Sequence, residues 1–513
     1  MKIMLISPYL DITSLSTRQL SSYLKAGGHS VAQVFLPDLE SMMKNGIDFE
    51  GCYPDEVVEQ IAELADDFDL LGMSLMTNYF IKMTHLTHGI RERIDIPIIW
   101  GGIHPTVAPE ECLNIADYIC IGEGEEALQE LADSLQNGIR PSHVKNIWFR
   151  DEQGECRNPV REPISNLDDI PFPDYDIEDQ YVLVGKKVLP LSEDILKEMV
   201  RGRVHFNEPH HLIYETMWTR GCPHHCAYCI NNHYRTLYSG FKTVRRRSVD
   251  NLIGEIRSIR EKFPWFNRIN FMDDDFASAS NEQLMHFRDR YKKEINCPFF
   301  SLLSVLSSGE EKLSILFDAG LRRTEIGIQS LSPSTNRLYR REFFSMEKLL
   351  KLAGTVEKVF PPDFSPTYDV ILENPWESVN DVLITLRGVL ELPRPFVLQL
   401  FSLTFFPGTA VFNKAMEDGI ITGSDASHLK EDHDRGFTYL NLLFLLVNKR
   451  VHNRVIRFFS WKPFAAVMES VPVKWLLSLF NPLYRVLKKR NVCKAQTKRF
   501  GWFIEEYSDK GQA

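Results

Sequence analysis

The sequence has no uninterrupted apolar run of the roughly 18 residues that a membrane-spanning helix needs. Its apolar start, Met1 to Ile6, is interrupted by Pro8 and Asp11 before it could serve as the core of a signal peptide. The nine cysteines show no disulfide framework, because their total is odd and all but three are scattered singly. These absences argue against a secreted disulfide scaffold and predict a location in the reducing cytoplasm.

The three remaining cysteines form the most informative motif of the chain. Cys222, Cys226 and Cys229 follow a short strand-like run, 214–218, at the spacing CxxxCxxC. An iron–sulfur cluster usually has four cysteine ligands, so three on a cubane leave one iron open to another ligand. Zinc is the alternative metal, because a nearby histidine could complete a set of four tetrahedral ligands.

The wider pattern, TRGCPHHCAYC, resembles that of the radical S-adenosylmethionine (SAM) superfamily. The resemblance implies that Cys222, Cys226 and Cys229 bind a 4Fe-4S cluster and that Tyr228 lies beside the adenine of SAM. It also implies that the open iron holds SAM by its amino and carboxylate groups. In this superfamily an external one-electron reductant of the flavodoxin or ferredoxin type reduces the cluster, which then cleaves SAM to a 5′-deoxyadenosyl radical.

Residues 1–140 alternate between short apolar runs and amphipathic segments. The alternation predicts an α/β, Rossmann-like domain in which helices cover both faces of a parallel sheet and ligands bind at the carboxyl ends of the strands. The predicted strands are 2–7, 31–35, 70–74, 97–100 and 118–121, and the predicted helices are 17–26, 55–65, 85–92, 110–114 and 125–136.

Two loops at these strand ends contain paired glycines, which let a backbone approach a bulky ligand closely. The loops are Gly101-Gly102-Ile103-His104 and Gly122-Glu123-Gly124. Together with the three-cysteine loop they resemble the cobalamin-dependent radical SAM class, over roughly residues 1–430. The resemblance implies that both loops bind cobalamin; a related domain that has lost its ligand is the alternative.

One motif of other cobalamin proteins is missing. After the first strand there is no Asp-x-His-x-x-Gly, so no histidine at that place can replace the lower base of the corrinoid. His104 is the alternative cobalt ligand, although a histidine in a glycine-rich loop is at least as often a turn residue. We therefore expect apolar or loop residues at the lower face of the cobalamin.

From 211 to 430 each unit contains one strand and one long helix, after a proline-punctuated linker and polar insert at 141–210. Six such units predict a partial (βα)6 barrel with its chemistry at the carboxyl ends of the strands. The predicted strands are 214–218, 268–272, 299–304, 324–328, 367–372 and 397–403, and the predicted helices are 250–263, 309–319, 333–342, 346–359 and 377–391.

Polar residues follow three of these strands. Asp273 and Asp274 come after the second strand, Gln329 and Ser330 after the fourth, and Glu373 after the fifth. In the radical SAM superfamily such positions contact the amino group, the ribose and the adenine of SAM, and carboxylates or small polar acceptors suit a cationic amino group and hydroxyls. The chain departs from the family's Glu-Ser at Gln329 and from its Gly-Leu-Pro-Gly-Glu-Thr at Glu373.

The last segment, 431–513, is predicted to be mainly helical and differs in charge. Between 448 and 500 there are thirteen Lys or Arg and one acid, Glu469, so this stretch carries about +12 and the rest about −22 of the net −10. Because apolar and aromatic residues are interspersed, it can form a helical cap on the barrel or dock at an anionic membrane surface. Nucleic acid is the least favoured partner.

The resemblance implies a cobalamin-dependent radical SAM enzyme that methylates an unactivated carbon by way of a 5′-deoxyadenosyl radical and methylcobalamin. The alternative reaction is radical oxidation or cyclisation without methyl transfer, as in the anaerobic magnesium-protoporphyrin ester cyclase. The alternative class is a non-catalytic corrinoid or iron–sulfur sensor. The roomy barrel and the apolar, basic tail favour a small-molecule or lipid-like substrate, with the protein in the cytoplasm or peripheral at the inner membrane surface.

Overall fold

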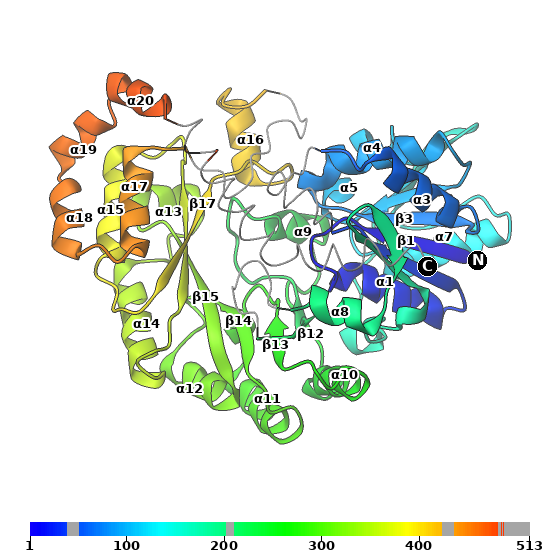
Figure 1. Cartoon of the computed structure of the whole chain (residues 1–513), viewed down its shortest axis with the longest axis horizontal. Coiled ribbons are helices and arrows are strands. Elements are labelled where there is room, and N and C mark those ends of the chain that lie inside the picture. The colour runs from blue at the N-terminus through cyan, green and yellow to red at the C-terminus, as the bar shows by residue number, and fades with distance from the viewer. Residues whose placement is uncertain (38–50, 202–209, 423–435, 481–483, 485, 487–513) are drawn as a thin grey trace.

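The computed structural model describes residues 1–37, 51–201, 210–422 and 436–480, with 484 and 486. Two sheets lie side by side, the first built from the N-terminal part of the chain and the second from its middle (Figure 1). Helix α9 (Asn231–Leu237) lies between them, and the C-terminal helices lie beyond the second sheet, away from the first.

The first sheet has nine strands in the order β7-β6-β5-β4-β3-β1-β2-β8-β9. Its central strands are parallel and apolar, because helices cover both of their faces. These strands are β1 (Lys2–Ser7), β2 (Ser30–Phe35), β3 (Leu70–Ser74), β4 (Ile98–Gly101) and β5 (Tyr118–Cys120). The Rossmann-like prediction is confirmed, and each strand end lies within one residue of its predicted position.

Helices pack in pairs on the two faces of this sheet. One face carries α1 (Leu15–Ala26) and α7 (Glu125–Gln136), and the other carries α3 (Asp55–Ala65) and α4 (Phe80–Arg91). Two short helices, α5 (Ile103–Val107) and α6 (Pro109–Cys112), follow β4. Helix α5 was not predicted, because it follows two glycines and contains a proline.

The segment 141–210 adds four strands to the same sheet. They are β6 (Ile147–Asp151), β7 (Gly154–Arg157), β8 (Gln180–Val184) and β9 (Lys187–Pro190), and helix α8 (Glu193–Met199) follows them. The buried Arg18 holds β8 in place, since its Nη1 donates to the Asp174 carbonyl (2.8 Å) and to Gln180 Oε1 (2.9 Å). The linker and insert are therefore partly sheet, while the domain limits themselves stay a prediction.

The second sheet has six parallel strands in the order β10-β13-β14-β15-β16-β17. They are β10 (Ile213–Thr216), β13 (Arg268–Phe271), β14 (Phe299–Leu303), β15 (Leu321–Gln329), β16 (Thr367–Leu372) and β17 (Val397–Ser402). Within the described residues the two outer strands, β10 and β17, do not pair with each other. The partial barrel of six strands is confirmed.

Helices follow the barrel strands: α10 (Val249–Lys262), α11 (Asn281–Glu294), α12 (Glu310–Ala319), α13 (Pro333–Leu338), α14 (Met346–Val359), α15 (Val379–Val389) and α16 (Ala410–Glu417). Helix α11 was not predicted, although its start has a capping box in which Ser280 and Gln283 bond to each other's backbone N–H groups. Its buried stripe is thin, with only Leu284, Phe287 and Tyr291, so its hydrophobic periodicity was a weak signal.

Four helices form the described C-terminal part: α17 (Tyr439–Asn448), α18 (Asn453–Phe459), α19 (Lys462–Met468) and α20 (Val471–Ser478). Helix α17 covers the outer strand β17, because the Asn448 side chain accepts from Leu398 N–H (2.8 Å) and donates to its carbonyl (2.7 Å). Helix α17 therefore acts as the predicted cap. No helix in the described ranges is long and apolar enough to cross a membrane. The basic residues from Arg485 onward lie outside the described residues.

Candidate active site

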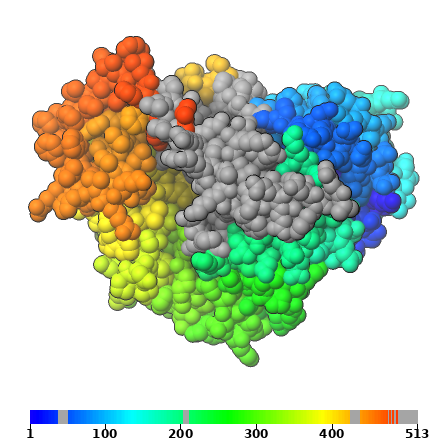
Figure 2. All heavy atoms as spheres, in the orientation of Figure 1, coloured from blue at the N-terminus to red at the C-terminus, as the bar shows by residue number. Residues whose placement is uncertain are grey.

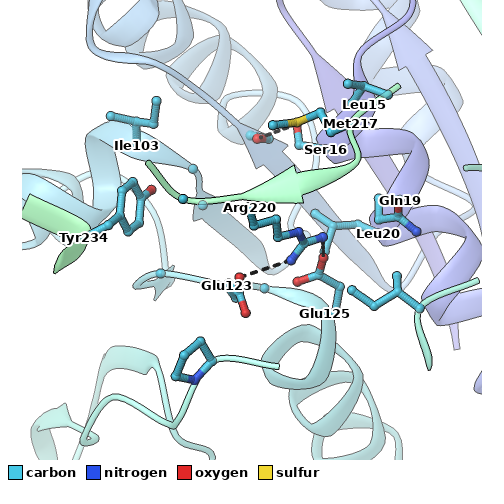
Figure 3. Close-up of a pocket in the computed structure, with 18 of the residues that line it drawn as sticks. Leu15, Ser16, Gln19, Leu20, Ile103, Glu123, Glu125, Met217, Arg220 and Tyr234 are labelled. Atoms are coloured by element: carbon cyan, nitrogen blue, oxygen red, sulfur yellow. Dashed lines mark hydrogen bonds and ion pairs between the residues drawn. The ribbon is translucent and has the colours of Figure 1, made fainter. Parts of the chain in front are cut away.

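A cavity of about 890 Å³ lies between the two sheets, at the carboxyl ends of their strands. The N-terminal sheet contributes the loops after β1, β3, β4 and β5, and the barrel contributes the end of β10 and residues 219–222 of the loop that carries the three cysteines. Figure 3 labels residues that follow β1, β4 and β5, together with Met217 and Arg220 of the barrel. A cavity of this volume is near the upper end of the range for small-molecule sites. Both predicted ligand-binding edges therefore open into one space.

The predicted glycines, Gly101, Gly102, Gly122 and Gly124, all line this cavity. Gly102 has φ 99°, and an added Cβ would lie 2.8 Å from the Leu75 carbonyl oxygen. Gly122 has φ 80°, and an added Cβ would lie 2.1 Å from the Tyr238 hydroxyl oxygen. At both positions glycine is required because neighbouring protein groups approach closely. These glycines therefore shape the wall of the cavity and also expose backbone atoms to it.

His104 does not reach the cavity, contrary to its prediction as a cofactor-binding residue. It is fully buried, and its ring packs against Phe80 at a centroid distance of 4.5 Å. Burial lowers the pKa of His104 to about 4, so the ring is neutral at neutral pH. Its neighbour Ile103 points into the cavity instead (Figure 3), and no histidine is among the described residues that line it.

The three cysteines lie between β11 (Thr219–Arg220) and α9, and β11 pairs with β12 (Arg245–Arg246). Ala227 fixes this loop to the barrel, because its N–H donates to the Tyr339 carbonyl (3.0 Å) and its carbonyl accepts from Val411 N–H (3.1 Å). No three His, Cys, Asp or Glu side chains of the described residues are grouped to hold a single metal ion. Each ligand of a cubane binds a different iron, so its sulfurs need not converge on one point.

All three thiols are partly exposed and therefore accessible to a metal cluster. Burial raises the pKa of Cys222 to about 12 and that of Cys229 to about 11, so as free thiols both stay protonated at neutral pH. Iron would bind them as thiolates, with release of the protons.

Arg341 supports the cysteine loop and was missed by the sequence analysis. Its Nη1 donates to the Tyr228 hydroxyl (2.8 Å) and lies 3.8 Å from Cys226 Sγ, while Nη2 donates to the Gly327 carbonyl (2.8 Å). A buried cation beside a cysteine sulfur suits a negatively charged cluster. No signal in the sequence singles out Arg341, because it lies more than a hundred residues from the cysteines.

The aspartates after β13 have different environments. Asp273 is fully buried and accepts hydrogen bonds from the N–H groups of Trp218 and Thr219 and from the Thr219 hydroxyl. Asp275 is buried and accepts from the Ser307 hydroxyl at 2.6 Å. Only Asp274 is exposed and lines the cavity. Contrary to the prediction, Asp273 therefore anchors the start of the cysteine loop, and Asp274 alone of the predicted pair is offered to a ligand.

Gln329 and Ser330 at the end of β15 also differ. Gln329 has a left-handed backbone (φ 63°), and its Oε1 has no hydrogen-bond partner in the described residues. Ser330 is fully buried, and its hydroxyl bonds with Glu377 Oε1 (3.2 Å) and Thr385 Oγ1 (3.1 Å). Contrary to the prediction, Ser330 is enclosed by protein, because it follows the left-handed Gln329 just past the end of β15 and its hydroxyl meets Thr385 of α15.

Glu373, where the family pattern has glycine, connects the barrel to the C-terminal helices. It keeps a left-handed backbone (φ 58°), and its carboxylate accepts from the Ser402 hydroxyl (2.6 Å), Gly436 N–H (2.6 Å) and Asn441 Nδ2 (2.9 Å). Asn441 belongs to α17. The departure from the family pattern at Glu373 thus secures the helical cap beside the carboxyl ends of β16 and β17.

Two protein-family models match the two parts of the chain that line the cavity. Residues 1–132 match the B12 binding domain, and residues 216–383 match the Radical SAM superfamily. The chain is a cobalamin-binding radical SAM enzyme. Its cofactors are cobalamin, SAM and a 4Fe-4S cluster, and the superfamily match decides against zinc at the three cysteines.

Two curated relatives resemble this radical SAM enzyme over most of its length. It is 26% identical over 435 residues to an uncharacterized methyltransferase, PH0819, of Pyrococcus horikoshii, covering 82% of this chain and 84% of that protein. It is 23% identical over 418 residues to the bacteriochlorophyllide d C-8(2)-methyltransferase of Chlorobaculum tepidum, covering 77% of this chain and 79% of that protein.

A solved structure shares the fold. OxsB, described as a cobalamin-dependent S-adenosylmethionine radical enzyme and solved with aqua-cobalamin and SAM bound, aligns with a TM-score of 0.63. The alignment covers 100% of this chain and 81% of OxsB at 15% identity. The likeness therefore concerns the fold.

The residues that line the cavity fit the three cofactors. Exposed glycine backbone and apolar side chains such as Leu15 and Ile103 suit the broad face of a corrin ring. On the barrel side, the partly exposed cysteine thiols suit a cluster. The carboxylate of Asp274 can accept from the amino group of SAM. Outside the residues that line this cavity, the buried Oε1 of Gln329 has no partner among the described residues and can accept from a hydroxyl. An apolar or loop-lined lower face of the cobalamin stays a prediction.

Proposed function

We propose that this enzyme methylates an unactivated carbon, replacing a C–H bond of its substrate by C–CH3. The observation that carries the proposal is the single cavity lined both by the cobalamin-side loops and by Cys222 and Asp274 of the barrel. Two cofactor sites that open into one space can act on the same substrate atom. The names of the two curated relatives, both methyltransferases, support the same reaction.

Each part of the chain has a distinct task in this proposal. Cys222, Cys226 and Cys229 hold the cluster, Asp274 and Gln329 orient SAM, and the glycine loops hold the cobalamin. When bound, the reduced cluster with SAM supplies a radical that removes a hydrogen atom, and cobalamin supplies the methyl group taken from a second SAM. Arg341 places a buried positive charge next to Cys226, where it can offset the negative charge of a cluster bound to the cysteines.

We further propose a large, apolar substrate, lipid-like or tetrapyrrole-like. One curated relative is named for a bacteriochlorophyllide, which supports a bulky, tetrapyrrole-like molecule. An external one-electron reductant of the flavodoxin or ferredoxin type completes the set of partners.

An anaerobic assay tests the reaction. The protein, reconstituted with cluster and cobalamin, is given SAM, a strong reductant and lipid or tetrapyrrole extracts, and 5′-deoxyadenosine and S-adenosylhomocysteine are measured. Substrate-dependent formation of both products is expected, and Cys226→Ala should reduce 5′-deoxyadenosine to background. The matched control Cys156→Ala changes a cysteine outside the cavity and should leave both products unchanged.

Other outcomes separate the alternatives. 5′-Deoxyadenosine without S-adenosylhomocysteine would favour radical oxidation or cyclisation. Neither product from fully loaded protein, across all extracts, would favour a sensor.

We also propose that the C-terminal helices contact an anionic membrane surface. Phe458, Trp461 and Trp475 are 75%, 64% and 63% exposed, next to the exposed cations Arg454 and Lys462. The one acid of these helices, Glu469, is turned inward, where it accepts from Leu440 N–H (3.1 Å). Figure 2 shows these helices, orange to red, as a lobe at the end of the molecule opposite the N-terminal domain. Exposed aromatic and basic side chains on one lobe suit the headgroup region of an anionic bilayer.

Liposome flotation with phosphatidylserine-containing and neutral vesicles tests this contact. Binding should need the anionic lipid, weaken at high salt, and fall in a Trp461→Ser/Trp475→Ser variant. Absence of binding to anionic vesicles at low salt would refute the membrane proposal without touching the methylation proposal.

A further inference from the structure

Arg220 connects the loop of the cluster ligands to the cobalamin-binding domain. It lies two residues before Cys222, and it pairs with Arg245 in the short ladder of β11 and β12. Gly221, between Arg220 and Cys222, has φ 91°, and an added Cβ would lie 2.0 Å from the Thr243 carbonyl oxygen. Because the chain is packed so closely at this turn, a displacement of Arg220 would be passed on to Cys222.

The side chain of Arg220 reaches the loop after β5 (Figure 3). Its Nη1 lies 3.2 Å from Glu123 Oε1, and its Nη2 lies 2.5 Å from Glu125 Oε1. The two glutamate side chains are only 13% and 6% exposed. Ion pairs that are shielded from water are screened less by salt than surface pairs, so these contacts hold their partners more firmly.

Glu123 also binds a second arginine. Arg245 Nη1 donates to Glu123 Oε2 (3.0 Å), Arg245 Nη2 donates to Oε1, and Ile164 N–H donates to Oε2 (3.0 Å). Burial by itself raises the pKa of Glu123, but the bonds from Arg245 and Arg220 bring it below its ordinary value, so the carboxylate is ionised at neutral pH. The N-terminal domain, the linker and the barrel therefore meet at one carboxylate.

We propose that Glu123 and Glu125, with Arg220 and Arg245, form an interdomain clamp that sets the position of the cluster loop relative to the cobalamin loop. Arg220 is then a positioning residue. Both oxygens of Glu123 are engaged by protein donors, so the clamp, rather than a bond to cobalamin, accounts for this glutamate.

Loss of the clamp should move loops without separating the domains, because other bonds join the two halves. Thr13 Oγ1 donates to Glu215 Oε2 (2.9 Å), and Ser248 N–H donates to Asp168 Oδ1 (2.8 Å). These bonds lie outside the clamp, so variants of the clamp residues keep them.

The test compares Arg220→Gln and Glu125→Gln with the wild type, all reconstituted anaerobically with cluster and cobalamin. The matched control is Glu130→Gln, because Glu130 lies on the same helix as Glu125 but pairs with Arg161 of the linker (2.6 Å). Loss of a charge-assisted bond predicts roughly tenfold faster amide hydrogen exchange at 121–125 and 219–226 in the clamp variants. The magnetic interaction between the reduced cluster and Co(II), measured by electron paramagnetic resonance, should also change, because it depends on their separation.

Two results would overturn the proposal of an interdomain clamp. Unchanged exchange and unchanged magnetic interaction in both clamp variants would do so, as would equal changes in Glu130→Gln. If Arg220→Gln fails to load the cluster, the result of Glu125→Gln decides whether the clamp exists, because this variant keeps the pair between Arg220 and Glu123. Neither readout needs a substrate, so failure of the clamp is distinguishable from failure of the methylation proposal.

Discussion

The two sheets turn the same kind of edge toward the central cavity but line it with different groups. The N-terminal sheet offers glycine backbone and apolar side chains, such as Gly102 and Ile103. The barrel offers a thiol and a carboxylate, those of Cys222 and Asp274. The corrin ring of cobalamin is broad and largely neutral, so it needs a wide apolar surface that lets it approach closely. The cluster and its zwitterionic ligand SAM instead need charged side chains and hydrogen-bond donors. The division of chemistry between the edges therefore follows from the ligands they hold.

The comparison also shows how each edge is kept in shape. On the N-terminal side, close contacts between loops fix the glycines, as at Gly102 and Gly122. On the barrel side, buried polar residues behind the site hold the loops, as Asp273 and Arg341 do for the cysteine loop. Substitutions should therefore act sterically on one edge and electrostatically on the other.

The largest effect is expected from Gly102→Val. The added side chain meets the Leu75 carbonyl at an unfavourable φ, so cobalamin content after reconstitution should fall to background while iron content stays at the wild-type level. Gly28→Val is the control, because Gly28 has a similar φ of 92° with nothing within 4 Å. It should cost about 1–3 kcal/mol of stability but keep cobalamin. Equal cobalamin loss in both variants would show that strain, not the shape of the cavity, is responsible.

The next largest effect is expected from substitutions that distinguish the roles of the adjacent Asp273 and Asp274. Asp274→Asn should weaken SAM binding about ten- to a hundredfold, measured by anaerobic equilibrium dialysis, because a charge-assisted bond to the amino group is lost. Asp273→Asn should instead lower stability by about 3 kcal/mol, since the new amide N–H group faces the N–H donors of Trp218 and Thr219. Loss of SAM affinity in Asp273→Asn, with unchanged stability, would contradict this assignment.

A smaller effect is expected at Glu373. Glu373→Ala should lower stability by about 2–3 kcal/mol, measured by urea unfolding, because three donors lose a charged acceptor. Glu373→Gly loses the same bonds but relieves the left-handed backbone, so it should be about 1 kcal/mol more stable than the alanine variant. A glycine variant no more stable than the alanine variant would argue against the strained backbone.

The smallest effect concerns His104. Its pKa of about 4 in the folded protein lies below the value of about 6.5 in the unfolded chain, so its contribution to stability is complete above pH 6.5 and declines toward pH 4. By pH 5 this loss reaches at most about 2 kcal/mol. His104→Phe should reduce the fall in melting temperature between pH 7.5 and 5 and leave the cobalamin absorption spectrum unchanged. A changed spectrum would show that His104 reaches the cobalt.

Much of the fold could be predicted because local sequence controls it. Strands such as β3 (Leu70–Ser74) and β16 (Thr367–Leu372) match the predicted limits, since apolar runs between turns leave little choice of boundary. Some of the elements that were missed depend on tertiary contacts. Strand β8, for example, joins the sheet next to β2, where the buried Arg18 binds it.

The sequence by itself determined the two cofactor-binding units and predicted the cysteine ligands, because these rest on short, local motifs with fixed spacing. Only the tertiary structure decided which of two adjacent residues reaches the cavity: Ile103 rather than His104, and Asp274 rather than Asp273. Which side chain faces the cavity depends on the local backbone and on what packs behind it, since Ile103 and His104 lie in the short helix α5 and Asp273 and Asp274 lie in the loop after β13. The contacts of Arg220 with Glu123 and Glu125, about a hundred residues away along the chain, likewise exist only after the two halves have folded together.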